Sequence, residues 1–315
     1  MREYLSPMEG ITGDIYRRTY HKYFYPMDKY FTPFLTAKPQ KKLSTKEIYE
    51  VAPSFNEGIF LVPQILGNNA EDFMHLAGIL KNEYGYRELN LNLGCPSGTV
   101  TAKGKGAGFL SDPMKLERFL DQIYSALDVK LSIKTRIGID EEEDWDDLLN
   151  VYRKFPISEL IIHPRLLIDH YKGTIHLDAF QKALESLEIP LCYNGDLFYK
   201  NDVFAIQEKI KSVDCIMYGR GAIRNPFLPG MAHSDEIPDA SLFEAFHDEL
   251  LDAYSERLSG DRNVLFRMKE LWAYWGKYFI DCDKQLKKIR KSQKISEYKV
   301  IALNLIRNCE MKGDH

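Results

Sequence analysis

Residues 90–108 read Asn-Leu-Asn-Leu-Gly-Cys-Pro-Ser-Gly-Thr-Val-Thr-Ala-Lys-Gly-Lys-Gly-Ala-Gly and join an apolar run to a glycine-rich loop. The alternating leucines Leu89, Leu91 and Leu93 predict a strand that ends at Gly94, and Cys95 follows directly. The glycines would let the loop backbone approach a ligand closely. The end of a buried strand is also where an α/β enzyme often carries an acid, a base or a nucleophile. A buried structural cysteine is the alternative explanation for Cys95.

Short apolar runs alternate with longer amphipathic runs over about 230 residues, which is the pattern of repeated βα units. Eight strands are predicted, at Tyr4–Met8, Tyr30–Phe34, Phe60–Leu66, Arg87–Cys95, Lys130–Gly138, Glu159–Arg165, Pro190–Asp196 and Cys215–Gly221. Helices are predicted between them, among others at Ala70–Glu83, Pro113–Leu127, Trp145–Lys154, Leu177–Leu187 and Asp202–Lys211. Eight such units predict a (β/α)8 TIM barrel. A doubly wound sheet is the alternative fold, but residues 6–10 after the first strand lack a GxGxxG pattern.

The pattern changes after Pro226. From about Ala240 to Gly313 the periodicity is helical, without strand alternation, and Gly260 divides two helical runs. We therefore expect a catalytic α/β barrel over residues 1–238 and an all-helical bundle domain over residues 239–315.

The charge of the chain is unevenly distributed. The net charge is −4, yet residues 261–315 carry 13 basic and 7 acidic side chains, an excess of six positive charges, so the remaining residues carry −10. A basic end on an acidic body suggests a face that meets a polyanion, although a solvated helical face is the alternative.

The cysteines and the apolar runs limit the class of protein. The five cysteines are scattered and form no CxxC pair, so we expect no metal site and a reducing, cytoplasmic setting. No apolar run reaches the roughly 20 residues of a membrane span. The first residues also lack the apolar core of a signal peptide, so we expect no membrane association.

Polar residues stand at the predicted carboxyl ends of the strands, where a TIM barrel keeps its chemistry. Lys134 and Arg136 alternate on one strand and His163 and Arg165 on another, and each would be costly to bury unpaired. Together they predict a shared anionic or polar ligand. The last two strands end in Asn194-Gly195-Asp196 and Gly219-Arg220-Gly221-Ala222, which resemble the phosphate cradle of many barrels.

These segments resemble the tRNA-dihydrouridine synthases, which are FMN-binding TIM barrels with a C-terminal helical domain. The resemblance covers the whole barrel in order, whereas the helical end matches in kind more than in motif. The matching segments are Pro7–Thr12, Gln64, Asn92–Pro96, Gly104–Ala107, Lys134–Gly138, His163–Arg165, Tyr171–Gly173, Asn194–Asp196 and Gly219–Ala222.

The resemblance implies a role for each matching residue. Pro7, Met8, Glu9 and Gln64 would surround the flavin ring, with Lys134 and His163 at its polar edge. Asn194, Gly195, Asp196, Gly219 and Arg220 would hold the ribityl chain and phosphate. NADPH, or NADH, would reduce the flavin, which would pass a hydride from N5 to C6 of a uracil ring in tRNA. Cys95 would protonate C5, and Asn92, Arg136, Arg165 and Tyr171 would lie near the base.

The same resemblance gives the helical end a role in binding tRNA. The target uracil must leave its stack to reach a flavin in the barrel mouth. Phosphate contacts would come from the basic residues Lys284, Lys287, Lys288, Arg290 and Lys291. Trp272, Tyr274 and Trp275 could stack on exposed bases, with helix-core packing as the alternative. We expect the protein to be a monomer.

Two positions depart from the family pattern. Asn90 stands where the family often has Asp, and Pro164 stands where it often has Gly. Both flank the site, so they bear on substrate placement more than on flavin binding. Two rival functions remain at this point: another FMN barrel acting on a small pyrimidine or enone, or a flavin-bound RNA-binding protein with little turnover.

Overall fold

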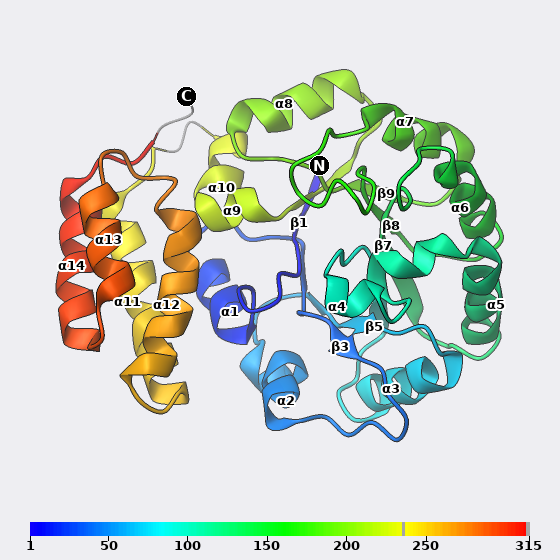
Figure 1. The fold of residues 1–315 in the computed structure, drawn as a ribbon, viewed down its shortest axis with the longest axis horizontal. Coiled ribbons are helices and arrows are strands. Elements are labelled where there is room, and N and C mark those ends of the chain that lie inside the picture. The colour runs from blue at the N-terminus through cyan, green and yellow to red at the C-terminus, as the bar shows by residue number, and fades with distance from the viewer. Residues whose placement is uncertain (235–236, 313–315) are drawn as a thin grey trace.

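The computed structural model describes residues 1–234 and 237–312 and contains a β/α barrel beside a helical bundle (Figure 1). All strand pairs of the barrel sheet are parallel. The strands are β1 (Arg2–Leu5), β2 (Lys29–Phe31), β3 (Leu35–Thr36), β4 (Leu61–Val62), β5 (Gln64–Leu66), β6 (Glu88–Leu93), β7 (Lys130–Arg136), β8 (Leu160–His163), β9 (Leu191–Tyr193) and β10 (Cys215–Tyr218).

The sheet closes through two interrupted strands. Its order is β3-β5-β6-β7-β8-β9-β10-β1-β2-β4, so β2 pairs with β4 at one end and β3 with β5 at the other. The predicted strand Phe60–Leu66 is thus two segments, β4 and β5, divided at Pro63. The predicted strand Tyr30–Phe34 contains only β2, and β3 begins beyond its end, after Pro33. Proline has no N–H to give to the ladder, which explains both breaks. The predicted TIM barrel of eight strands is confirmed.

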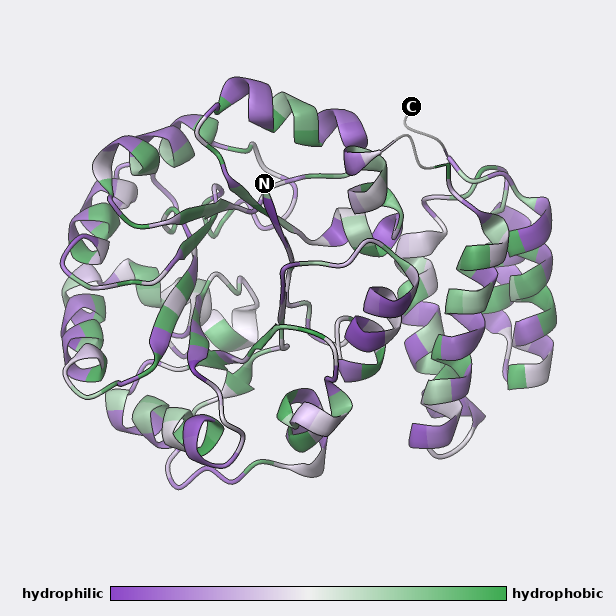
Figure 2. Ribbon diagram, turned by 180° about the vertical axis from the view of Figure 1, so that it is seen from behind, coloured by the Kyte–Doolittle hydropathy of each residue, from purple (hydrophilic) through white to green (hydrophobic). Residues whose placement is uncertain are grey.

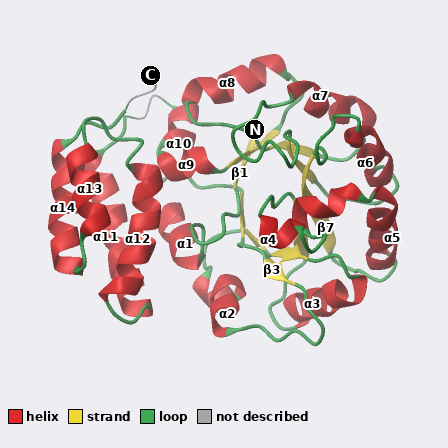
Figure 3. Ribbon diagram, viewed as in Figure 1, coloured by secondary structure: helices red, strands yellow, loops and turns green. Residues whose placement is uncertain are grey.

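Most helices surround the strands on the outside, whereas the short α4 (Gly98–Thr101), in the loop after β6, is seen inside the ring in this view (Figure 3). In chain order the barrel helices are α1 (Asp14–Tyr23), α2 (Thr45–Val51), α3 (Ala70–Asn82), α4 (Gly98–Thr101), α5 (Pro113–Tyr124), α6 (Asp144–Tyr152), α7 (Leu177–Ser186), α8 (Lys200–Lys209), α9 (Arg220–Arg224) and α10 (Leu228–His233), with short 3-10 turns at Pro53–Phe55 and Gly106–Ser111. Hydrophilic and hydrophobic residues alternate along them in Figure 2. Helix α5 shows why: Asp112 caps it by accepting from the Lys115 N–H at 2.9 Å, Pro113 fills the first turn, and its buried residues are Leu116, Phe119, Leu120 and Ile123.

Apolar residues fill a separate small cluster on the barrel strands. Its members are buried and come from six different strand segments: Tyr4, Phe31, Val62, Ile161, Cys192, Cys215 and Met217. Cys192 and Cys215 therefore pack as small hydrophobic side chains. This packing leaves the polar chemistry to the carboxyl ends of the strands.

The helical bundle consists of α11 (Ala240–Arg257), α12 (Asp261–Trp275), α13 (Asp283–Lys291) and α14 (Ile295–Asn308). Helix α11 packs against α1 of the barrel, and α12 packs against α9 (Figure 1). The helical character of this end agrees with the prediction, while the boundary at 238/239 stays a prediction and residues 313–315 lie outside the described part. Within that part no helix is long and apolar enough to span a membrane.

A buried hydrogen-bond network holds three helices of the bundle together. The Trp272 indole N–H donates to the Tyr298 hydroxyl at 2.8 Å, and His247 Nε2 lies 2.7 Å from the same oxygen. Trp272 and Trp275 are buried, so core packing explains both tryptophans.

We expect Tyr298→Phe to lower the free energy of unfolding by about 1–3 kcal/mol, because it leaves the buried Trp272 and His247 groups unpaired. Urea titration followed by tryptophan fluorescence measures the change. Tyr84→Phe is the control, since the half-buried Tyr84 hydroxyl makes no hydrogen bond within the described residues. An equal change in both variants would contradict the role of the network.

Candidate active site

A cavity of about 320 Å³, here called the reaction cavity, opens at the carboxyl ends of the barrel strands. All eleven residues predicted to hold the cofactor line it, and so do Cys95, Asn92 and Tyr171. Five further residues line it as well: Ser6, Pro33, Phe34, Gly94 and Tyr274. Of these the sequence suggested only Tyr274, as a residue that could stack on exposed bases. Four of these follow strand ends, so their position after a strand was the available signal.

Arg136 and Arg165 do not line the reaction cavity and instead support its wall. Arg136 donates to the carbonyl oxygens of Gly94, Leu166 and His170 at 3.1, 2.8 and 2.6 Å. Both guanidinium groups are buried, and all the carbonyls they bind except that of Gly94 belong to the loop that follows β8. They fix that loop, and their predicted position near a bound base stays a prediction.

Arg165 also anchors an acidic residue of the cavity. Its guanidinium makes two hydrogen bonds to the Asp196 carboxylate, at 2.9 and 2.7 Å, and two to the Gly173 carbonyl. Arg220 binds the same carboxylate at 2.5 Å. Asp196 is thus clamped between two cations, which fixes the loop after β9.

Tyr171 stands at the mouth of the cavity with 48% of its surface exposed. The guanidinium groups of Arg136 and Arg220 lie 5.3 and 4.8 Å from its ring centroid. The His163 ring lies 6.2 Å away and nearly parallel to it. This ring is therefore held in place yet remains open to solvent, as a stacking platform requires.

A chain of side-chain amides leads from the barrel interior to Cys95. The Asn90 amide donates to Ser132 Oγ at 2.9 Å and accepts from Gln64 Nε2 at 2.8 Å. The Gln64 oxygen accepts from Asn92 Nδ2 at 2.7 Å. The Asn92 oxygen in turn accepts the backbone N–H groups of Gly94 and Cys95, at 3.1 and 3.0 Å. Asn90, which departs from the family pattern, thus helps to orient the turn that carries the thiol.

The backbone around Cys95 is closely packed. Gly106 has a φ of +56°, and a Cβ there would lie 2.8 Å from the Cys95 carbonyl oxygen. Only glycine suits this position, because it combines a left-handed backbone with a close approach. Burial raises the pKa of the Cys95 thiol, while the Ser97 backbone N–H and the cations Arg136 and Lys134 oppose this rise.

The reaction cavity is short of negative charge at its base. Lys134 makes no hydrogen bond or ion pair within the described residues, and burial, with the nearby Arg136, lowers its pKa to about 8. Burial and the same cations push the pKa of His163 well below its usual value, so this ring is neutral at pH 7. An acceptor-rich ligand would complement these groups.

The two glycine-rich turns after β9 and β10 complete the cavity. Asn194 donates to the Met217 carbonyl at 2.8 Å and so ties the two strand ends together. A Cβ at Gly195 would lie 2.0 Å from the Tyr193 hydroxyl, and one at Gly221 would lie 1.7 Å from the Leu197 carbonyl. Gly195 in the turn after β9 and Gly221 in α9 thus both need to be glycine for close packing beside Arg220.

The predicted tRNA-contacting basic residues lie outside the reaction cavity, on α13. Lys284, Lys287, Lys288, Arg290 and Lys291 are all exposed. Tyr274 of α12 does reach the cavity mouth, unlike its buried neighbours Trp272 and Trp275. Within the described ranges, no cluster of three or more His, Cys, Asp or Glu side chains could hold a metal ion.

Comparison with known proteins now identifies the family. Residues 4–291 match the family described as dihydrouridine synthase. The chain belongs to this family. Its predicted recognition as a tRNA-dihydrouridine synthase relative is thereby confirmed.

Several curated relatives are similar over most of the chain. "Probable tRNA-dihydrouridine synthase 2" of Bacillus subtilis (strain 168) is 29% identical over 80% of this chain and 78% of its own. "tRNA-dihydrouridine synthase B" of Pasteurella multocida (strain Pm70) is 28% identical over 72% of this chain and 67% of its own. The match to "Probable tRNA-dihydrouridine synthase 1" of Synechocystis sp. is 28% identical and spans 62% of that protein.

The barrel also resembles a solved reductase structure. Morphinone reductase superposes with a TM-score of 0.52 at 12% identity, over 77% of this chain and 88% of its own. At this identity the likeness supports the fold alone. Family membership agrees with the predicted class of flavin-dependent oxidoreductase.

The raised pKa of Cys95 can be tested by alkylation. A thiol whose pKa is raised stays protonated to higher pH, so iodoacetamide should modify Cys95 with a midpoint above that of N-acetylcysteine measured in parallel. Peptide mass spectrometry gives the extent of modification at each pH. A midpoint below the reference thiol would mean that the cations, not burial, control this group.

Proposed function

We propose that this chain reduces the C5=C6 double bond of a uridine in tRNA to 5,6-dihydrouridine, with FMN as cofactor and NADPH or NADH as reductant. One observation carries the proposal: Cys95 and the unpaired Lys134 line the same cavity, and the chain belongs to the dihydrouridine synthase family. We expect the protein to act as a monomer in the cytoplasm.

The cavity's donors and glycine turns fit a flavin mononucleotide. Lys134 would face the electron-rich edge of the ring, where a cation stabilises the reduced flavin. Gln64 has its amide oriented by Asn90 and Asn92, so its contact with the ring would be fixed in advance. Asn194, Gly195, Gly219 and Arg220 would hold the ribityl chain and phosphate. When bound, FMN would supply the hydride that is added at C6.

Cys95 is suited to deliver the proton to C5. Burial raises the pKa of its thiol, so the group carries its proton at neutral pH. The Asn92 amide holds the Gly94 and Cys95 backbone and thereby positions the thiol. A protonated thiol is what an acid requires, whereas a nucleophilic cysteine needs a lowered pKa.

The surroundings of the cavity fit an RNA substrate. The names of the curated relatives include tRNA, and we extend that substrate to this chain. A flipped uracil could stack near the exposed Tyr171 ring at the cavity mouth. The exposed cations of α13 would then contact phosphates without reading sequence.

The decisive experiment is nucleoside mass spectrometry of tRNA incubated with the purified protein and NADPH. We expect a gain of two hydrogens on one uridine, and we expect Cys95→Ala to keep its flavin spectrum while losing at least 99% of this activity, because the general acid is absent. Cys309→Ala is the control, since Cys309 lies outside the reaction cavity.

Two outcomes would contradict the proposal. Unchanged product with Cys95→Ala would rule out the acid role. A yellow protein that forms no dihydrouridine but reduces a free pyrimidine or an enone would move the activity to small molecules.

The flavin site can be tested through Lys134. We expect Lys134→Met to weaken FMN binding about tenfold or more, because one charge-assisted hydrogen bond is lost. Fluorescence quenching of FMN titrated with the apoprotein measures the dissociation constant. Lys130→Met is the matched control, since Lys130 is exposed at the other end of β7. Equal affinity in the two variants would refute the assignment.

A further inference from the structure

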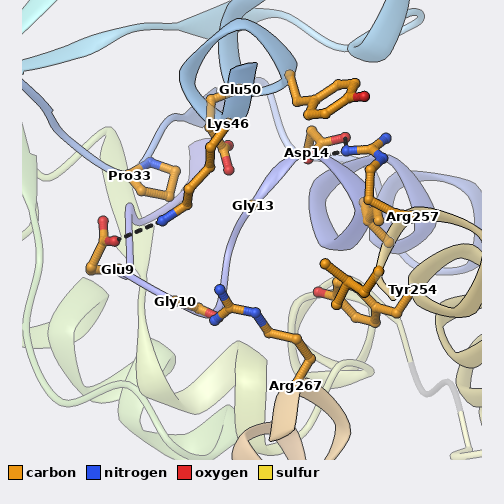
Figure 4. Close-up of a pocket in the computed structure, with 13 residues that line it drawn as sticks. Glu9, Gly10, Gly13, Asp14, Pro33, Lys46, Glu50, Tyr254, Arg257 and Arg267 are labelled. Atoms are coloured by element: carbon orange, nitrogen blue, oxygen red, sulfur yellow. Dashed lines mark hydrogen bonds and ion pairs between the residues drawn. The ribbon is translucent and has the colours of Figure 1, made fainter. Parts of the chain in front are cut away.

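A second cavity of about 330 Å³, here called the interdomain cavity, lies between the barrel and the helical bundle (Figure 4). Its walls come from residues 9–15, from α2, and from α11 and α12. Glu9 and Pro33 line both this cavity and the reaction cavity. The two cavities therefore adjoin at the same face of the barrel.

The acidic residues of the interdomain cavity are already paired. Glu9 pairs with Lys46 at 3.3 Å, and Asp14 pairs with Arg257 at 3.0 Å. Glu50 pairs at 2.8 Å with Arg17, which is fully buried behind it. These carboxylates therefore do not require a cation from outside.

Hydrogen-bond donors remain in excess. Arg267 donates through Nη1 to the Gly10 carbonyl and to Glu270, and Arg257 uses only Nη1 on Asp14. The Nε and Nη2 groups of both arginines have no hydrogen-bond partner within the described residues. The Tyr254 hydroxyl has none either, although Tyr254 is only 8% exposed, and it points into the cavity in Figure 4.

The walls of the interdomain cavity combine bare backbone, an aromatic contact and apolar side chains. Gly10 and Gly13 form one wall without side chains, and a Cβ at Gly13 would lie 3.0 Å from Glu50 Oε1. The guanidinium of Arg257 lies 3.8 Å from the centroid of the Tyr49 ring, which makes the opposite side rigid. The lining also includes the apolar Ile15 and Leu258. A cavity with apolar walls and a few polar donors is typical of small-ligand pockets.

We propose that the interdomain cavity binds a nucleotide that neighbours the target uridine in the tRNA chain. This inference rests on the proposed function. The deeply placed Tyr254 hydroxyl and Arg267 would donate to the base, whose carbonyl and ring nitrogen atoms accept hydrogen bonds. Lys46, which is 65% exposed at the rim, would meet a phosphate.

Chain connectivity favours this occupant over a free nucleotide. A uridine placed in the reaction cavity brings its covalent neighbours to the adjoining opening at Glu9 and Pro33. The neighbour's phosphate is anionic, and the donors left over in this cavity outnumber its free acceptors. Because α11 and α12 supply one side, the helical bundle would help to set which nucleotide stands beside the target.

The test measures the KM for tRNA transcripts with the full-length protein. We expect Tyr254→Phe and Lys46→Met each to raise this KM about fivefold, the loss expected for one hydrogen bond, with kcat within about twofold. The controls are Tyr84→Phe and Lys42→Met, an exposed lysine that does not line the cavity. Flavin reduction by NADPH should be unchanged in all four variants.

Abasic transcripts identify the ligand. Two transcripts lack the base on the 5′ or the 3′ side of the reduced uridine. We expect one of them to raise the wild-type KM about fivefold and to abolish the further effect of Tyr254→Phe, since the partner of the hydroxyl is gone.

The outcomes separate this proposal from the one on which it rests. A wild-type protein that forms no dihydrouridine overturns both. Dihydrouridine formation with an unchanged KM in both variants overturns only the interdomain site. An increased KM for NADPH in Tyr254→Phe assigns the cavity to the reductant and also overturns it. A Tyr254→Phe effect that persists on both abasic transcripts excludes a base as its partner.

Discussion

Closure of the parallel sheet brings the carboxyl ends of all its strands to one rim, and the rest of the site depends on this. The pairs β2–β4 and β3–β5 complete the circle, although Pro33 and Pro63 interrupt both strands. Residues as distant in sequence as Pro7 and Arg220 consequently line one cavity. Without closure, the strand ends would spread along an open edge.

Electrostatics then shape the rim in two different ways. Asp196 pairs with two arginines, Arg165 and Arg220, and these ion pairs hold the loops that form the wall. Lys134 receives no such partner and is left beside the neutral His163. Burying an uncompensated ammonium group is unfavourable, so a protein retains one where a ligand completes it. The ion pairs of Asp196 support the structure, whereas we expect Lys134, which no described residue pairs with, to contact the ligand.

Much of the barrel and its cavity could be predicted from the sequence, because apolar and polar residues alternate along the strands and polar residues follow the strand ends. The predicted cofactor residues all line the cavity. In a closed barrel the carboxyl end of every strand lies at the same rim, so a residue at a strand end can be placed there without knowing which strands are adjacent. The alternation along this strand could not show that Lys134 lines the cavity and Arg136 does not. The Arg136 guanidinium is engaged by backbone carbonyls of a loop, and the conformation of a loop cannot be read from a repeating sequence pattern. Tyr274 could not be separated from Trp272 and Trp275 either. Which of the three reaches the rim depends on how α12 packs on α9.

The packing of the bundle on the barrel has a consequence for substrate choice. On the proposed function, a barrel mouth alone would recognise a uracil ring, but free uridine offers the same ring. Glu9 and Pro33 join the reaction cavity to a second opening whose far side is α11 and α12. Only a substrate that continues beyond the ring can reach Tyr254 and Arg257. The contact between α1 and α11 holds this second opening beside the reaction cavity. Binding energy gained there, away from the reacting ring, would favour a polynucleotide over a free pyrimidine.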